Sequence, residues 1–526
     1  LFTGASNTIT NAVTFSNTGA ITFGNSSSDS STFNNGLTTT APSQINLGGT
    51  LQTSNDAMSL GDANTAIVLV ANSVLNTGSA ALTVNTTVNG GFTLTLNSTD
   101  ATTFAGIVGG SAAPTAITTN SGGTVVFNTT AITSSGGQTY GENATIGANI
   151  TFTTGGNNLT FSGTVNSVSS TKTLDIVAGA GNTTFSGTVG GSEALGNTTI
   201  GTAVLTVGAI KVQGTLAITN SGTSTITGII SDGDSAAILT KAGAGTLTLS
   251  GDNTFTGATT VSAGVLAISH ADSLGTTDGA TTIADGAALN ISGGITTAAE
   301  AITVSGTGSN NGVIRNSSGA NTYSGAITLG ANSEIQSNSG TLTLNVASGS
   351  AITASNKNIA FDGAGNITVA DPIATGSGTL TKTGGGTLTL SAANTYTGAT
   401  TISAGTLAIS NATALGTTDA ATTVANNSSL SISGGITVAE AITIRGTGVS
   451  SGGAIAFTSG DNTYSGAITL AATSTIVSTG GAQTISGTTN AGQALTITAN
   501  DNLIISGVVG GSTALSTYAV TTTGSA

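Results

Sequence analysis

The sequence predicts an all-β protein, a right-handed parallel β-helix of about 22 coils with roughly 24 residues in each coil. Three observations lead to this prediction. A long segment returns nearly unchanged later in the chain, a shorter period lies within it, and apolar residues alternate with polar ones in short runs. Such a chain is expected to be a solenoid, in which each coil contacts only its neighbours.

The long repeat is evident in the amino-acid sequence. The segment from Leu239 to Ile268 returns from Leu380 to Ile409, so equivalent positions differ in number by 380 − 239 = 141. The same shift relates Leu274 to Leu415. Repetition at a fixed period limits the architecture and therefore also the function.

The repeat suggests a division of the chain into two parts. Residues 151–526 are expected to form a regular β-helix that contains the duplication, with copies at 239–379 and 380–520. Residues 1–150 are less regular, and we expect amino-terminal coils there that carry loop insertions.

A shorter motif, Asn, Thr, aromatic, Ser or Thr, Gly, occurs four times, and its aromatic positions differ in number by 68, 73 and 68. Upstream, two similar segments contain Asn158 with Phe161 and Asn182 with Phe185, and the phenylalanine positions differ by 185 − 161 = 24. With about 24 residues per coil, the intervals of 68 and 73 correspond to three coils and the shift of 141 to six. The motif residues are Asn253, Phe255, Gly257, Asn321, Tyr323, Gly325, Asn394, Tyr396, Gly398, Asn462, Tyr464 and Gly466.

The residues within each period indicate strands. Leu247 and Leu249 alternate with threonines, and Ile327 and Leu329 flank Thr328, so apolar residues recur at every second position. These runs are short, rich in β-branched residues and bounded by Gly, Asn, Ser and Asp. Three short strands per coil, each paired with the next coil, give a parallel β-helix.

The composition favours a narrow column of coils over a globule. Aromatic residues make up 3% of the chain, Trp is absent, and there are 78 glycines but only three prolines. Small aliphatic residues fill a narrow column, glycine suits its corners, and proline would remove a donor from a strand ladder. We expect Phe161 to stack on Phe185 as core filling, rather than as a ligand platform, and Asn158 and Asn182 to form turns with an added amide ladder.

The charge balance excludes two classes of partner. Seven basic and 21 acidic residues give a net charge of −14. Nucleic acid and anionic membranes both require clustered Lys and Arg, so neither is an expected partner. The chain has no cysteine, which removes disulfides and thiolate chemistry.

Few residues are candidates for catalysis or metal binding. The one histidine, His270, is expected in a solvated turn because the second copy has Asn411 there. Asp232 and Asp234 are the closest acidic pair, with Lys241 the nearest base, while five glutamates stand alone in the sequence. We therefore predict no catalytic, cofactor or metal site. The isolated glutamates are Glu142, Glu193, Glu300, Glu334 and Glu440.

The segment from Lys241 to Ile268, with its copy from Lys382 to Ile409, resembles the passenger-associated transport repeat of bacterial autotransporters. The resemblance rests on Gly245 to Gly257 and on Gly264 to Leu266. It implies export through the outer membrane of a Gram-negative cell and display outside it as a right-handed β-helix. In that family the passenger is usually an adhesin or a surface-layer component.

Several expectations about the whole protein follow. No initiator methionine, signal segment or carboxy-terminal barrel is visible, so we expect an interior or processed piece of a longer protein. Its most apolar run, Ala66 to Ala71, is too short to span a bilayer, so no membrane insertion of this segment is expected. Uncapped coils would expose strand edges, which favours pairing with a second copy, end-to-end or side-by-side.

The expected function is a non-catalytic, secreted structural protein of the outer cell surface. Its β-helical rod would form an extracellular filament or surface layer, or would act as an adhesin stalk that meets a host or matrix surface. The alternative is a polysaccharide-degrading β-helix enzyme that uses clustered carboxylates. A calcium-dependent module using Asp232 and Asp234 is a third hypothesis.

Overall fold

The computed structural model describes residues 1–309, 311–490, 492–500, 502–511 and 513–522. The chain divides into two compact units, Leu1–Thr259 and Thr260–Ala526. Each unit is a stack of coils whose strands pair in parallel, which confirms the predicted all-β parallel solenoid. Among these residues the one helical element is a short 3-10 turn, η1 (Val449–Ser451), and no helix is long and apolar enough to cross a membrane. The expected boundary near residue 150 stays a prediction.

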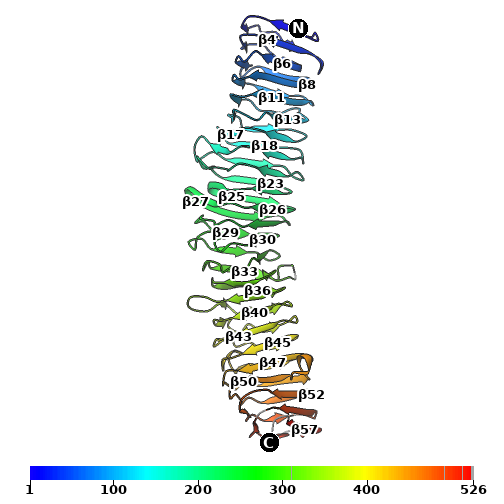
Figure 1. Cartoon of the computed structure of the whole chain (residues 1–526), viewed down its shortest axis with the longest axis vertical. Coiled ribbons are helices and arrows are strands. Elements are labelled where there is room, and N and C mark those ends of the chain that lie inside the picture. The colour runs from blue at the N-terminus through cyan, green and yellow to red at the C-terminus, as the bar shows by residue number, and fades with distance from the viewer. Residues whose placement is uncertain (310, 491, 501, 512, 523–526) are drawn as a thin grey trace. The chain divides into compact units, whose positions relative to one another are not determined.

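The pairings of the first unit arrange its strands in three columns. One column contains β1 (Asn7–Ile9), β4 (Ser30–Phe33), β6 (Ile45–Thr53), β8 (Ala66–Gly78), β11 (Thr93–Ser98), β13 (Ala116–Thr119), β16 (Gln138–Tyr140), β19 (Leu159–Phe161), β22 (Thr183–Phe185), β24 (Leu205–Val207), β26 (Thr223–Ile226) and β28 (Thr246–Leu249). A second contains β2 (Val13–Phe15), β5 (Leu37–Thr39), β7 (Met58–Leu60), β9 (Leu82–Val84), β12 (Ala101–Phe104), β14 (Thr124–Phe127), β17 (Asn143–Ile146) and β20 (Val165–Ser167). The third contains β3 (Ile21–Phe23), parts of β6 and β8, β10 (Thr87–Asn89), β15 (Ala131–Thr133), β18 (Ile150–Thr153), β21 (Leu174–Val177), β23 (Thr198–Thr202), β25 (Ile210–Asn220) and β27 (Ile230–Ala242). Figure 1 shows these strands stacked coil upon coil, from β4 to β27.

The second unit repeats this plan, and β29 (Thr259–Val261) includes the point where the two units divide. One column contains β35 (Ala320–Tyr323), β37 (Thr341–Leu344), β40 (Asn366–Val369), β43 (Thr387–Leu390), β45 (Gly405–Ile409), β47 (Ser428–Ser433), β50 (Ile455–Ser459), β52 (Ile468–Ser478), β55 (Ala494–Ala499) and β57 (Thr517–Thr522). The next contains β30 (Val265–Ile268), β32 (Ala288–Ile291), β34 (Ile314–Asn316), β36 (Ile327–Ser337), β39 (Ile359–Asp362), β42 (Leu380–Lys382), β44 (Thr400–Ile402), β46 (Thr422–Val424), β49 (Ile442–Gly446), part of β52 and β54 (Thr489–Asn490). The last contains β31 (Thr281–Ile283), β33 (Ile302–Gly306), part of β36, β38 (Ile352–Ala354) and β41 (Ile373–Ala374). A separate four-stranded sheet contains β48 (Thr437–Val438), β51 (Thr463–Tyr464), β53 (Gln483–Ile485) and β56 (Leu503–Ile505).

Coil length varies around the predicted value. Register partners differ in number by 216 − 198 = 18 between β23 and β25, and by 361 − 335 = 26 between β36 and β39. The longest strands, such as β27 and β36, each contribute to two columns because a register shift lets the chain turn a corner while it stays extended. Coils therefore differ in length mainly at the corners, where the strand ladder is interrupted.

The long duplication does not contain a whole number of coils. Six register steps lead from Tyr323 down its column to Phe457, whose number is higher by 457 − 323 = 134, not by 141. Tyr464, the repeat partner of Tyr323, follows on β51 in a different column. The expectation of six whole coils is thus corrected to six coils and one further strand, because these coils are on average shorter than predicted. Equivalent motif residues therefore lie on different columns.

In strands such as β16 and β19, every second side chain points into the coil interior and packs on its equivalent one coil away. Phe161 and Phe185 are in register, and their rings are stacked with centroids 5.3 Å apart. Tyr140 stacks on Phe161 from the preceding coil, with centroids 5.0 Å apart. Phe104 and Phe127 form a second stack. Stacking at the spacing of the ladder, about 4.8 Å, makes the interior a continuous apolar column.

This packing predicts that core and outward positions of one strand respond differently to truncation. Phe161→Ala should destabilise the fold by about 3–5 kcal/mol, since it opens a cavity and removes the ring contacts with Tyr140, Phe152 and Phe185. Thr160→Ala, whose side chain points outward on the same strand, should cost less than about 1 kcal/mol. The urea midpoint followed by circular dichroism measures both, and equal shifts for the two variants would contradict the assignment of the interior.

Candidate functional site

The asparagines of the repeat motif are buried where coils turn. In each case the side-chain oxygen accepts a backbone N–H from the preceding coil, which satisfies a donor that the strand ladder cannot reach. The four bonds run from Ile230 to Asn253 at 2.8 Å, from Ile295 to Asn321 at 2.8 Å, from Ile373 to Asn394 at 2.8 Å, and from Ile436 to Asn462 at 3.0 Å.

The motif aromatics fill the interior. Phe255, Tyr323, Tyr396 and Tyr464 are all buried. The Tyr323 hydroxyl donates to the carbonyl of Glu300 at 2.9 Å, and the Tyr464 hydroxyl donates to that of Glu440 at 2.7 Å. These rings therefore act as core residues with a satisfied polar end, and they offer no platform to a ligand.

The motif glycines are required by close approach of the preceding coil. A Cβ added at Gly466 would lie 2.0 Å from the carbonyl oxygen of Glu440, and one at Gly325 would lie 1.7 Å from that of Glu300. The corresponding distances at Gly257 and Gly398 are both 2.3 Å. The steric limit comes from backbone contact between coils, and no positive φ is involved.

The upstream asparagines make a different contact from the expected amide ladder. The side-chain oxygen of Asn158 accepts the backbone N–H of Asn182, one coil further on, at 2.9 Å. Both residues are exposed at the coil corner. The prediction of a ladder was wrong, because the backbone N–H at the corner needs an acceptor more than the neighbouring amide does.

The repeat lysines are buried, and their ammonium groups donate hydrogen bonds to backbone carbonyls at the corners. Lys241 donates to the carbonyls of Ala242 and Gly243, both at 2.8 Å, and Lys382 donates to that of Gly384 at 2.8 Å. Burial lowers the pKa of both lysines to about 8. Lys241, expected as the base nearest to the acidic pair, thus lies inside the coil with its ammonium on backbone carbonyls.

The acidic pair does not form a joint site. Asp232 accepts the N–H of Ala237 at 2.7 Å and the hydroxyl of Thr256 at 2.8 Å. Asp234 accepts the hydroxyl of Ser170 at 2.6 Å. Each carboxylate therefore has its own protein donors.

His270 lies in a turn, half-exposed, and its Nδ1 accepts the N–H of Asp272 at 3.3 Å. Asp252 lies beside them, and one ligand atom from each of the three residues is within 4.8 Å of the others. This trio was missed in the sequence because its members are separated along the chain. The second copy of the repeat has no ligand-bearing side chain of this kind at the equivalent positions, which are Ala393, Asn411 and Thr413.

The isolated glutamates separate into two groups. Glu193 and Glu334 are partly exposed. Glu142, Glu300 and Glu440 are buried, with 2–4% of their surface exposed. Sequence reasoning missed this shared placement, although a signal was present: Ala-Glu-Ala-Ile-Thr occurs around both Glu300 and Glu440.

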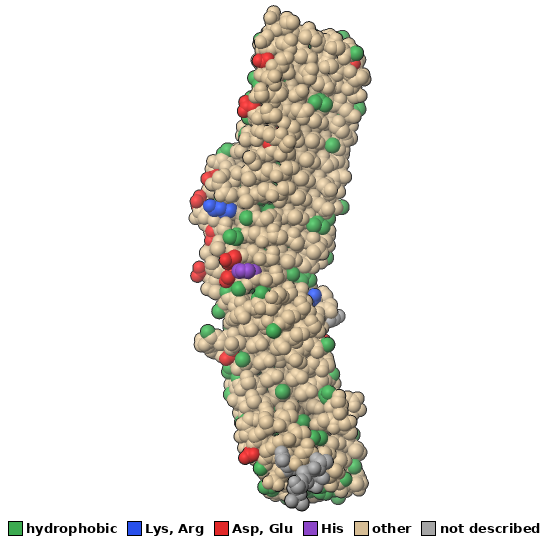
Figure 2. All heavy atoms as spheres, in the orientation of Figure 1, with side chains coloured by type: hydrophobic (Ala, Val, Ile, Leu, Met, Phe, Trp, Pro, Cys, Tyr) green, Lys and Arg blue, Asp and Glu red, His purple; other side chains and the backbone are tan. Residues whose placement is uncertain are grey.

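The outer surface of the first unit has a continuous file of threonines, one on each of eight successive coils. Strand pairing holds these uncharged threonines in register from one coil to the next. Figure 2 shows charged side chains as isolated patches on a mainly uncharged polar surface. The threonines are Thr95, Thr118, Thr139, Thr160, Thr184, Thr206, Thr225 and Thr248.

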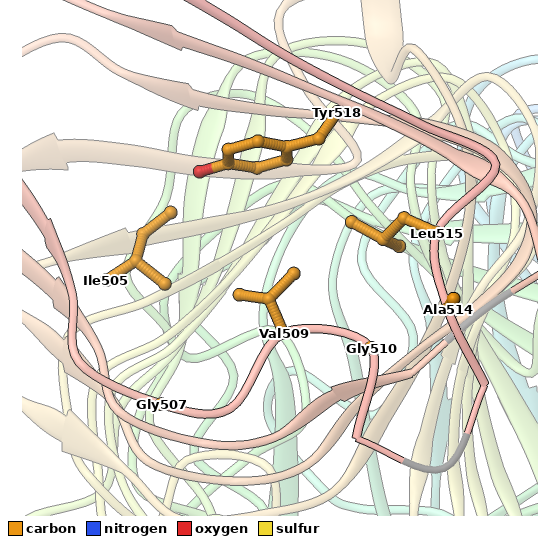
Figure 3. A pocket seen from close by; sticks show the side chains of 7 residues that line it. All are labelled: Ile505, Gly507, Val509, Gly510, Ala514, Leu515 and Tyr518. Carbon is orange, nitrogen blue, oxygen red and sulfur yellow. The ribbon is translucent and has the colours of Figure 1, made fainter.

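An apolar hollow of about 430 Å³ lies in the coils around β56 and β57. Figure 3 shows Ile505, Val509, Leu515 and Tyr518 pointing into it. Tyr518 is the ionisable residue among the described residues of its lining, and partial burial raises the pKa of its phenol. Val509 and Tyr518 in its lining are exposed, so the hollow is open to solvent.

The glycine geometry predicts a large difference between two alanine substitutions. Gly466→Ala should cost more than about 4 kcal/mol, because the new Cβ meets backbone rather than a mobile side chain. Gly385→Ala is the matched control, since its Cβ would meet nothing within 4 Å, and it should be neutral or slightly stabilising. Comparable urea midpoints for the two variants would contradict the proposed coil contact.

The hydrogen bonds of Asp232 predict that removal of calcium leaves the thermal stability of the chain unchanged. Its oxygens already accept bonds from the chain, so we expect the melting temperature to be the same with a chelator and with added calcium. A fall in melting temperature on chelation that Asp232→Asn abolishes would show instead that the calcium hypothesis is right.

Comparisons with known proteins bear on the repeat segments. The model of the passenger-associated transport repeat matches residues 239–268 and 380–409. Over 112 residues the chain is 38% identical to the adhesin BmaC autotransporter of Brucella suis biovar 1 (strain 1330), which covers 21% of this chain and 3% of that protein. No solved structure matches. The resemblance noted in the sequence is confirmed: the chain carries two copies of the passenger-associated transport repeat of bacterial autotransporters.

Proposed function

We propose that this chain is part of an autotransporter passenger displayed at the outer surface of a Gram-negative cell, where its coils form the non-catalytic scaffold of an adhesin. The observation that carries the proposal is where the residues of the repeat motif lie and what they contact. Its asparagine, aromatic and glycine residues are all used in holding one coil on the next. The residues of the passenger-associated transport repeat therefore stabilise the stacking of one coil on the next.

The chemistry of the surface supports a scaffold that functions outside the cell. The chain has few charged residues, and hydroxyl and amide groups supply its polar surface. Such groups are less sensitive to salt than charge networks are. The relative over part of the chain is named an adhesin, which agrees with a role in surface contact.

The location is tested on intact cells that produce the native protein. Antibodies against this chain should label unpermeabilised cells, and external protease should remove the label. Labelling that appears only after permeabilisation would refute display at the surface.

The non-catalytic part of the proposal is tested separately with the purified chain. Incubation with a panel of polysaccharides should release neither reducing ends nor unsaturated products. Release by the intact chain would favour the polysaccharide-degrading alternative.

Assembly into a filament or surface layer is a second candidate function. The observation that favours it is the apolar hollow beside β57, together with exposed apolar side chains at Ile504, Val508 and Val520. A further coil packed against these apolar groups would remove them from water. A second copy of the chain would supply such a coil. Electron microscopy of the native material separates the two candidates, since long uniform fibres support assembly and separate short particles support an adhesin scaffold.

A further inference from the structure

Three glutamates make the same side-chain contact inside the coils. Glu142, Glu300 and Glu440 are each buried, and each accepts a hydroxyl from a threonine of the preceding coil. The donors are Thr119, Thr281 and Thr422, and the last bond measures 2.6 Å. The same arrangement on three coils, in both units, indicates a specific construction.

The second oxygen of each carboxyl group is buried without a hydrogen-bond partner. These atoms are Oε1 of Glu142, Oε2 of Glu300 and Oε2 of Glu440. A buried carboxylate that lacks both a cation and a full set of donors is strongly disfavoured. A neutral carboxylic acid avoids this penalty, because it carries no charge and needs fewer donors.

The ionisable groups that face these glutamates are tyrosines. Tyr140 lies beside Glu142, Tyr323 beside Glu300, and both Tyr396 and Tyr464 beside Glu440. The hydroxyls of Tyr323 and Tyr464 donate to the backbone carbonyls of Glu300 and Glu440, not to their carboxyl groups. None of these neighbours supplies a positive charge that would favour the carboxylate.

We propose that Glu142, Glu300 and Glu440 are proton-binding positions that the coils hold as neutral acids, so that coil formation takes up protons and the stack is more stable in mild acid than at neutral pH. The device is independent of adhesion or assembly, since it depends only on how the coils close.

The direction of the effect follows from proton linkage. Burial raises the pKa of Glu300 and of Glu440 to about 7, and it also raises the pKa of Glu142. In the unfolded chain a glutamate has a pKa of about 4.3. Between these values the folded state binds more protons, so this contribution to stability is complete below about pH 4.3, falls as pH rises and is lost above about pH 7.

The test compares the wild type with the double variant Glu300→Gln, Glu440→Gln, which mimics the neutral acids. Urea midpoints are measured at about pH 5 and about pH 7.5, either side of the expected titration. The wild-type midpoint should fall between the two pH values. In the double variant the midpoint at the higher pH should rise, and most of the fall should disappear. Glu193→Gln is the control, because it removes one partly exposed carboxyl group and should leave the fall unchanged.

A second measurement applies even if the variant folds poorly. Infrared spectra of the folded wild type at about pH 6 should contain a protonated carboxylic acid band, because burial raises the pKa of Glu300 and of Glu440 to about 7. Loss of pH dependence in the double variant together with this band would support the proposal. A fall in midpoint that persists in the double variant, or a folded wild type with only ionised carboxylates at that pH, would overturn it.

Discussion

The stack depends on satisfying the backbone where each coil turns. Along a strand the ladder pairs the backbone N–H and C=O groups with the two neighbouring coils. At a corner the ladder stops, and these polar groups need other hydrogen-bond partners. Asparagine side chains take over this role. The oxygens of Asn143, Asn158 and Asn358 accept backbone N–H groups of the following coil, at 2.9–3.0 Å. The motif asparagines make the corresponding contact to the preceding coil, from a buried position.

The same constraint explains the rest of the repeat. Coils that approach closely enough to pair at the corners leave no room for a Cβ, which fixes the motif glycines such as Gly466. Turn carbonyls need donors, and the buried ammonium of Lys382 supplies them. Glu440 contributes its carbonyl to Tyr464 while its carboxyl group remains inside the coil. A few ionisable groups are thus tolerated in an apolar column because backbone groups at the corners require partners.

Much of this fold could be predicted from the sequence, because alternation and repetition are local properties. The strands at Leu247 and Ile327, the burial of Tyr323 and Tyr396, and the stacking of Phe161 on Phe185 all follow from patterns that a single chain displays. The number of coils in the duplication could not be predicted from these local patterns. It depends on corner lengths, which the ladder does not constrain and which differ from one coil to the next. The buried glutamates were missed for a related reason, since isolated acidic residues are normally solvated and only the columns show that Glu300 and Thr281 meet across a coil.

Native-state hydrogen exchange of the corner amides measures whether asparagine side chains hold one coil on the next. The N–H groups of Thr164, Asn182 and Thr379 lie at corners outside the ladder, and each donates to an asparagine. We expect these three amides to exchange slowly, at rates close to those of ladder amides in strands such as β22. Exchange at the rate of an unstructured peptide would show that the asparagine contacts do not hold the coils together.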